Sequence, residues 1–241
     1  MLQQWQASPL GQALIRAEAQ LLAGTFDGVF GLELLQLGTW GAGRELLSPS
    51  HIRRQSVVAE RLDGPGRADL IADLAHLPIQ SGMVDAVLLP HTLEFAPDPY
   101  AVLREADRVL GAEGQLIVLG FRPASPWGLR SKFTDSGYPP GLQRQLSPGR
   151  VRDWLSVLSY EIVTERPYLY RWPRQPRQPV TNPEGTTLSI LRRGWSYPWP
   201  SSAYVIKARK RVYTLTPIRP RLRDRDRERV RVLGGLVEPG I

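Results

Sequence analysis

The chain has 241 residues, no cysteine and a formal net charge of +8 at neutral pH. This length can bury the core of one α/β domain, and the lack of cysteine excludes disulfides and thiolate chemistry. No apolar run approaches the roughly 18 to 20 residues that span a bilayer. The N-terminus also lacks the basic start and long apolar stretch of a signal peptide, so we expect a cytoplasmic protein without membrane segments.

An N-terminal helical segment is predicted within residues 1–30. Apolar residues recur at helical spacing over 9–23, Ser8 can cap the free N–H groups, and Gly24 marks the expected end. Residues 32–37 then predict a strand that leads into a glycine-rich turn. The chain is therefore expected to begin with a helix that lies across a sheet.

Two further strands are predicted at residues 55–60 and 68–72. The residues between them are too few for a parallel crossover, which needs about a dozen. The sequence at 63–66, Asp-Gly-Pro-Gly, instead favours a hairpin turn. We therefore expect these strands to pair antiparallel, with the helix that would otherwise join them reduced or absent.

The clearest pattern lies in residues 72–121. Residues 84–89 form a short apolar run that is typical of a strand buried on both faces. Asp98 and Pro99 mark the start of a helix with one apolar face, and residues 115–119 predict a second buried strand. A strand, a helix and a strand in this order predict a right-handed crossover between parallel strands.

Residues 122–200 are predicted to form a variable region on the acceptor side of the sheet. A loop over 122–148, rich in Pro, Gly, Ser and Arg, holds Trp127, which either covers a site or packs on the core. A helix follows that loop, and strands are predicted at residues 160–165 and 203–208.

Two C-terminal features bear on nucleic-acid binding. Seven aromatic residues from Tyr168 to Tyr204 alternate with arginines; this pattern can grip single-stranded nucleic acid, although a small core of their own is the favoured interpretation. Residues 207–241 hold eleven Lys or Arg against four Asp or Glu. We predict a domain over 1–211 and a disordered basic tail over 212–241. Such a tail can contact phosphates, but its alternating Arg and Asp favour a solvated tail without that partner.

The middle of the chain resembles a known family. The residues that carry the likeness are Asp73, Leu77, Pro78, the VDAV stretch at 84–87, the READRVL stretch at 104–110 and Gly114. They are similar to the middle of a class I S-adenosylmethionine (SAM)-dependent methyltransferase of the type-11 methyltransferase domain. The resemblance implies a three-layer, Rossmann-like α/β sheet with flanking helices, of which the second is reduced here. It also implies S-adenosyl-L-methionine as cofactor, bound beyond the carboxyl ends of the parallel strands.

The resemblance places a glycine turn against this cofactor. Gly38, Thr39 and Gly41 belong to the turn, where the backbone must approach the ligand closely. Two positions depart from the family pattern. Gln36 replaces an acid that helps to hold the cationic methionine end, and Trp40 replaces a small residue.

The resemblance also implies contacts from three other elements. Glu60 would accept hydrogen bonds from the ribose hydroxyls, unless a hairpin points it to solvent. Asp73 would pair with the adenine amino group and Leu74 would flank the ring; the alternative for Asp73 is the cap of a turn. Pro90 opens the loop that lines the methyl-transfer pocket in the family.

His91 and Glu94 in this loop are the candidate catalytic residues. Either could act as a base on an acceptor, Glu94 only if burial raised its pKa. Methyl transfer needs no obligatory catalyst, because positioning the acceptor supplies much of the rate, so a loop contact is the favoured role of His91. The three histidines show no metal-ligand spacing, and we predict no metal.

The sequence thus predicts a SAM-dependent methyltransferase that acts on an unidentified acceptor. The alternative is a non-catalytic, methyltransferase-like protein that has lost the cofactor and binds a partner such as RNA through its basic tail. The altered glycine turn keeps this alternative open.

Overall fold

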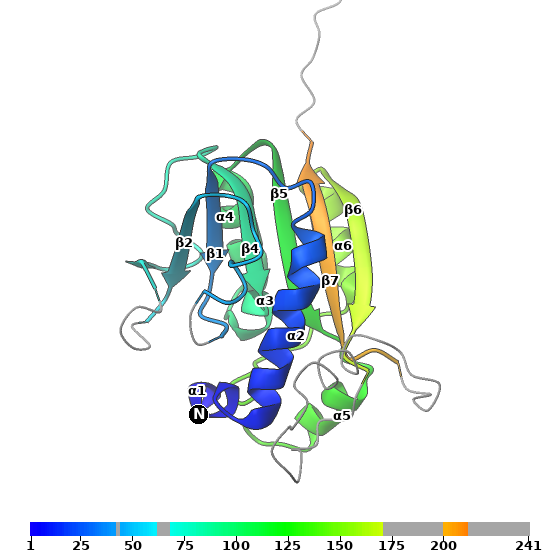
Figure 1. Ribbon diagram of the computed structural model, residues 1–241. Helices are drawn as coiled ribbons and strands as arrows, with labels where there is room; N and C mark the ends of the chain where they lie inside the picture. Colours follow the sequence, from blue (N-terminus) through cyan, green and yellow to red (C-terminus); the bar gives the residue numbers. More distant parts are fainter. Residues whose placement is uncertain (42–43, 62–67, 171–199, 212–241) are drawn as a thin grey trace, which may run out of the picture.

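The computed structural model describes residues 1–41, 44–61, 68–170 and 200–211. In this part of the chain the strands form one sheet in the order β3-β2-β1-β4-β5-β7-β6 (Figure 1). The strands are β1 (Glu33–Leu37), β2 (Arg54–Ala59), β3 (Leu70–Ile71), β4 (Val84–Pro90), β5 (Leu110–Phe121), β6 (Tyr160–Tyr168) and β7 (Ala203–Lys210). The helices are α1 (Leu2–Gln6), α2 (Pro9–Thr25), α3 (Thr92–Phe95), α4 (Pro99–Val109), α5 (Pro126–Lys132) and α6 (Pro148–Val157).

The sheet has a parallel centre and one antiparallel strand. β1 pairs parallel with both β2 and β4, and β4 pairs parallel with β5, as the strand–helix–strand pattern predicts. β7 runs antiparallel between β5 and β6. With helices on its faces, this sheet confirms the three-layer, Rossmann-like α/β fold.

The predicted antiparallel pairing of the second and third strands is wrong. β2 and β3 pair parallel, with Val58 opposite Leu70 and Ala59 opposite Ile71. The prediction assumed a full-length strand over 68–72, whose return would need a long crossover. Because β3 is short and pairs only with the end of β2, the chain has little distance to travel back. Residues 62–67, which were expected to form the hairpin turn, lie outside the described residues.

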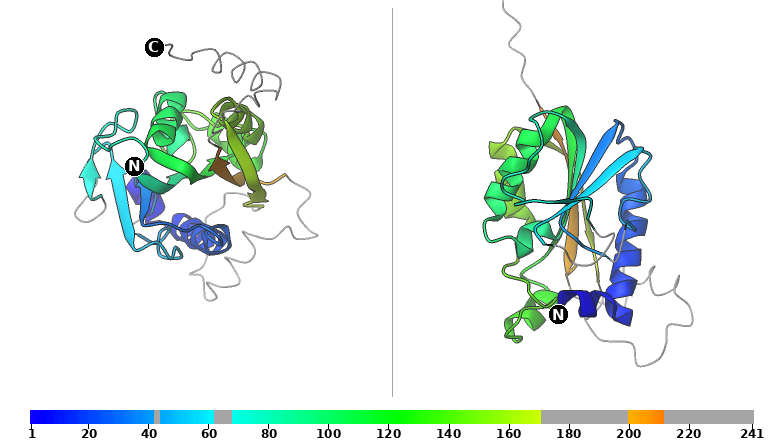
Figure 2. Two further views of the ribbon diagram at one scale, coloured as in Figure 1. Left: turned by 90° about the horizontal axis from the view of Figure 1, so that it is seen from above. Right: turned by 90° about the vertical axis from the view of Figure 1, so that its left-hand side faces the viewer.

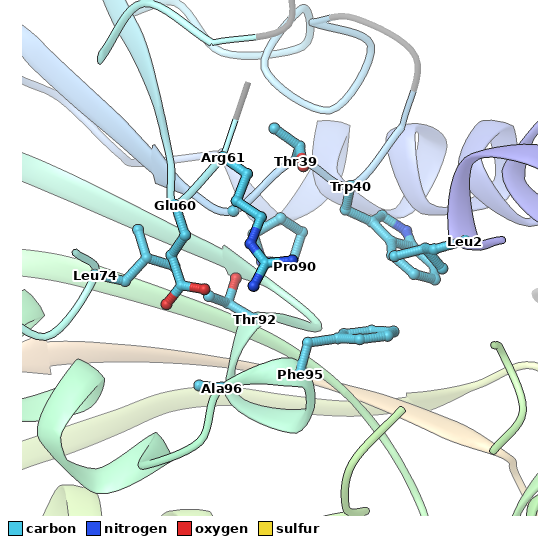
Figure 3. Close-up of a pocket in the computed structure, with 11 residues that line it drawn as sticks. Leu2, Thr39, Trp40, Glu60, Arg61, Leu74, Pro90, Thr92, Phe95 and Ala96 are labelled. Carbon is cyan, nitrogen blue, oxygen red and sulfur yellow. The ribbon is translucent and has the colours of Figure 1, made fainter. Parts of the chain in front are cut away.

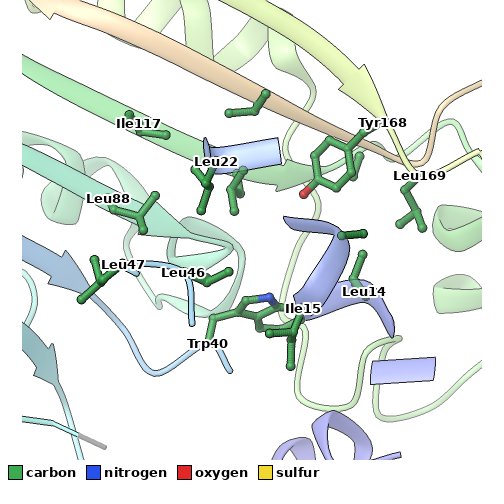
Figure 4. Packing of buried hydrophobic residues seen from close by; sticks show 14 of the residues in the cluster. Leu14, Ile15, Leu22, Trp40, Leu46, Leu47, Leu88, Ile117, Tyr168 and Leu169 are labelled. Carbon is green, nitrogen blue, oxygen red and sulfur yellow. The ribbon is translucent and has the colours of Figure 1, made fainter. Parts of the chain in front are cut away.

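Helices cover both faces of the sheet (Figure 2). α2 lies on one face, and α4 and α6 lie on the other. Between α2 and the sheet, Leu22 lies beside Leu88 of β4 and Ile117 of β5, and Leu14 belongs to the same apolar cluster (Figure 4). Each face thus has its own apolar core, and the central strands are buried from both sides.

Local capping chemistry sets the start of the two longer helices. The hydroxyl of Ser8 accepts a hydrogen bond from the Gly11 N–H at 3.2 Å, which confirms it as the cap of α2. Asp98 Oδ1 likewise accepts from the N–H groups of Tyr100 and Ala101 at 3.1 and 3.0 Å. Gly24, however, does not end α2. The helix continues to Thr25 because the following residue, Phe26, buries its ring in the core.

Three short helices were missed by the sequence reasoning. α1 and α5 lie at the end of the sheet where the parallel strands finish (Figures 1 and 2), and α3 directly follows β4. α5 lies in the predicted loop, although Ser125 caps it by accepting from the Gly128 N–H at 3.0 Å. Trp127 of this helix is fully buried and stacks on Phe121, so it belongs to the core.

Several predictions concern residues that the structure does not describe. The tail at 212–241 and the aromatic residues within 171–199 lie outside the described residues. Both, like the domain boundary at 211, stay predictions. Among the described helices, none has the length and apolar character needed to cross a membrane.

Candidate functional site

A pocket opens at the carboxyl ends of the parallel strands. The residues that line it are Leu2, Gly38, Thr39, Trp40, Glu60, Arg61, Leu74, Pro90, Thr92, Phe95 and Ala96 (Figure 3). They follow β1, β2, β3 and β4, and α1 adds Leu2. The strand order reverses between β1 and β4, and ligands of open α/β sheets bind at such a switch point.

The two ends of the pocket differ in chemistry. Glu60 stands at one end beside Leu74, and Arg61 extends over Pro90 toward the middle of the pocket; Glu60 and Arg61 are both exposed (Figure 3). Trp40 and Phe95 lie at the other end. The pocket therefore offers charge and hydrogen bonds at one end and aromatic surface at the other.

The turn after β1 is shaped for close approach. Gly38 has a φ of +91°, and a Cβ there would lie 3.0 Å from the hydroxyl oxygen of Thr92. That hydroxyl donates a hydrogen bond to the Leu37 carbonyl, so the turn lies directly against the end of β4. Gly41 has a φ of +97° and is likewise a position that favours glycine.

Gln36 is buried below this turn rather than in the pocket wall. Its Nε2 donates to the Gly38 carbonyl at 2.9 Å, which ties the side chain to the turn. Its Oε1 has no hydrogen-bond partner among the described residues. An acceptor is thus left free directly beneath the glycine turn.

The two predicted cofactor acids are placed differently. Glu60 lines the pocket, whereas Asp73 does not, although its neighbour Leu74 does. Asp73 Oδ1 accepts from the Ala75 N–H at 2.8 Å, and Oδ2 lies 2.8 Å from His76 Nδ1. These hydrogen bonds hold the pKa of Asp73 below its usual range. The contacts are those of the turn cap that was the alternative for Asp73.

The two catalytic candidates lie inside the molecule. His91 is 0% and Glu94 is 1% exposed, and neither lines the pocket. His91 Nε2 lies 2.8 Å from Oε1 of Glu18, and its Nδ1 lies 3.3 Å from Oε2 of Glu94. Both side chains thus belong to a buried ionic cluster, and a role for either as a base on an acceptor stays a prediction.

Two further side chains complete this cluster. The Tyr168 hydroxyl donates to Glu18 Oε1 at 2.9 Å, and Trp40 Nε1 donates to Glu18 Oε2 at 2.6 Å. Sequence reasoning missed Glu18, although a signal was present. Glu18 follows Leu14 by four residues and so lies on the apolar face of its helix, where an acid requires buried partners.

Charge within the cluster follows from its burial. Burial alone would lower the pKa of His91, but the carboxylates of Glu18 and Glu94 outweigh this effect and raise it to about 9. Burial raises the pKa of Glu94, and the contact with His91 limits that rise. Burial and the negative charge of Glu18 raise the pKa of Tyr168 well above its ordinary value, so its hydroxyl stays a donor. His91 is therefore an imidazolium at neutral pH.

Comparisons with known proteins agree with this geometry. A family model for a methyltransferase domain matches residues 51–118. The uncharacterized Escherichia coli (strain K12) protein YafS is 31% identical over 231 residues, which cover 94% of this chain and 88% of YafS.

Two solved SAM-dependent methyltransferases share the fold. The protein from Thermotoga maritima has a TM-score of 0.55 at 17% sequence identity, and the superposition covers 82% of this chain and 92% of the Thermotoga chain. The protein from Archaeoglobus fulgidus has a TM-score of 0.54 at 16% sequence identity, and the superposition covers 80% of this chain and 94% of the Archaeoglobus chain.

A methyltransferase domain of this class implies SAM as its cofactor. The residues present fit such a ligand. Gly38 lines the pocket without a side chain, since a Cβ at this position would press against Thr92. Glu60 stands at the polar end of the pocket with two carboxylate oxygens. Gln36 does not line the pocket, and its contact with the methionine end stays a prediction.

Proposed function

Because the chain belongs to the family of YafS and carries a class I methyltransferase domain, we propose that it transfers the methyl group of SAM to an acceptor molecule. The observation that carries this proposal is the pocket at the β1/β4 switch point, with a glycine turn on one side and an acid at the end of β2. Both features are where the sequence resemblance predicts the cofactor contacts.

The polar end of the pocket is suited to the adenosine part of the ligand. Glu60 accepts hydrogen bonds from the ribose hydroxyls, and Leu74 packs against the adenine ring. Asp73 acts indirectly, since its hydrogen bond to the Ala75 N–H fixes the turn that presents Leu74. The glycine turn at Gly38 then leads toward Trp40 and Phe95, where the methionine end lies.

Bound SAM supplies an electrophilic methyl group on a sulfonium sulfur and leaves as S-adenosylhomocysteine. The chain's task is to align an acceptor lone pair with that methyl group and to exclude water, which supplies much of the rate. Among the described lining residues the ionisable ones are Glu60 and Arg61, and Glu60 stands at the opposite end from Trp40 (Figure 3).

A transfer assay tests this proposal. SAM with a labelled methyl group is incubated with the full chain and separate pools of small molecules, RNA and protein, and S-adenosylhomocysteine is measured alongside the label. We expect label in one pool with matching S-adenosylhomocysteine. Absence of transfer to every pool, together with absence of SAM binding, would contradict the enzyme and support the non-catalytic alternative.

Matched variants tie the activity to the pocket. Glu60→Gln removes the charge at the end of β2 and lowers the transfer rate at limiting SAM by about tenfold. Glu33→Gln removes a carboxylate at the amino end of the neighbouring β1, where it pairs with Arg54 at 2.8 Å, and leaves the rate unchanged. Equal effects of the two variants would contradict the assignment of Glu60.

A further inference from the structure

Trp40 is the main departure of this pocket from the family pattern. It stands on the glycine turn, where the family has a small residue, and its indole is only 3% exposed although it lines the pocket. The ring packs against His91 with centroids 4.5 Å apart and against Phe95 at 6.0 Å. A side chain of this size on the turn must be held to one side if a ligand is to approach the backbone.

The buried cluster supplies that restraint. Trp40 Nε1 donates to one oxygen of Glu18 at 2.6 Å, which fixes the plane of the indole. The second oxygen of Glu18 accepts from the Tyr168 hydroxyl at 2.9 Å and lies 2.8 Å from His91 Nε2. Glu18 itself is 0% exposed, so water does not compete for these contacts.

The cluster is anchored to several elements of the fold. Glu18 comes from α2, His91 and Glu94 follow β4, and Tyr168 ends β6. Glu94 accepts from the backbone N–H of Phe121 at the end of β5, and the His91 ring stacks on the Phe121 ring at 3.9 Å. The carboxylate that faces Trp40 is therefore fixed to rigid parts of the molecule rather than to a loop.

We propose that Glu18 is a positioning residue of the cofactor pocket: it holds the Trp40 indole against the interior and thereby keeps the glycine turn open to SAM. This inference rests on the proposed function. Glu18, His91, Glu94 and Tyr168 do not line the pocket, so they act on it through Trp40. By holding the indole to one side, the cluster leaves room for the ligand despite the large residue at position 40.

A double-mutant cycle on SAM affinity tests the inference. A glutamine at position 18 has one acceptor oxygen and cannot serve both Trp40 and the pair formed by His91 and Tyr168. Glu18→Gln is expected to weaken SAM binding to the full chain about tenfold, and Trp40→Phe, which removes the donor of the same hydrogen bond, by a similar factor. The double variant should be no weaker than the weaker single variant, because both changes remove one hydrogen bond. Unchanged affinity of Glu18→Gln, or factors that multiply in the double variant, would overturn the inference.

A second pair of variants keeps the inference testable if Glu18→Gln does not fold. Tyr168→Phe and Tyr204→Phe each remove one buried phenol hydrogen bond, but the Tyr204 hydroxyl donates to the Leu146 carbonyl at 3.0 Å in the core on the other face of the sheet. Only Tyr168→Phe should weaken SAM binding, by about threefold or more. Equal losses would show a general effect of destabilisation and contradict the inference. A wild-type chain that binds no SAM would instead refute the proposed function itself.

Discussion

Two contacts between a carboxylate and an imidazole have the same length, but one lies on the surface and the other in the interior. His76 Nδ1 lies 2.8 Å from Asp73, and His91 Nε2 lies 2.8 Å from Glu18. The side chains of the first pair are 83% and 59% exposed, whereas those of the second are both 0% exposed. The exposed contact caps a turn beside the pocket, and the buried one holds the pocket wall from behind.

The difference shows that burial, rather than residue type, decides what such a pair does. Around the exposed pair, water and salt screen the charges, so its contribution is small and local. Inside the molecule, each charge depends on its partners, because removing one leaves the others without compensation. Substitution of any member of the buried cluster is therefore expected to lower the stability of the protein, whereas substitutions in the exposed pair should have little effect.

The largest expected effect comes from removing the buried imidazole. His91→Ala leaves Glu18 and Glu94 buried without their cation and should lower the free energy of unfolding by about 3–5 kcal/mol. For a domain of this size that corresponds to a fall in Tm of about 6–20 °C. Thermal unfolding followed by circular dichroism measures it.

His76→Ala is the matched control. Because His76 is largely exposed, its removal should shift the Tm by about 1 °C or less. A similar fall for both variants would show that burial does not separate the two pairs.

A somewhat smaller effect is expected from pH. The pKa of His91 is raised from 6.5 to about 9 by Glu18 and Glu94, with Tyr168 as the neutral neighbour. The folded state therefore holds a proton that the unfolded state has lost, so this stabilisation is complete below pH 6.5 and is lost as the pH rises through 9. The loss amounts to about 3 kcal/mol between these values.

Urea unfolding at several pH values, in wild type and in His91→Gln, measures this dependence. The variant lacks the imidazolium, so its stability should change less over the same range. A wild-type stability that stays constant from pH 6.5 to 9.5 would contradict a charged, buried His91.

The smallest expected effect separates the two acids beside the pocket. Glu60→Gln should weaken SAM binding about tenfold, because Glu60 lines the pocket. Asp73→Asn should weaken it by about threefold or less, since we propose that Asp73 acts through its hydrogen bond to the Ala75 N–H in the turn that carries Leu74. Isothermal titration compares them, and a larger loss for Asp73→Asn would restore the direct adenine contact that the resemblance implies.

Local signals predicted much of the fold. The caps at Ser8 and Asp98 could be read from the sequence because capping depends on neighbouring residues. The parallel pairing of β4 and β5 followed from a strand, a helix and a strand close together. The pairing of β2 with β3 was not predictable in this way, because it depends on how short β3 is in the folded sheet.

The candidate site depends even more on contacts between residues that are far apart in the sequence. Gly38, Glu60 and Leu74 line the pocket, and their contact with the cofactor stays a prediction. The role of His91 was not readable, because its partner Glu18 is 73 residues away and Tyr168 is 77 residues away. A histidine in a pocket loop and a histidine in a buried cluster look identical until distant elements are packed together.

Calorimetric titration of SAM into the full wild-type chain shows whether the pocket holds the cofactor. We expect binding at one site per chain and a thermal stabilisation of about 2.7 kcal/mol when SAM is present at 100 times its Kd. No binding heat and no stabilisation at millimolar SAM would contradict this expectation.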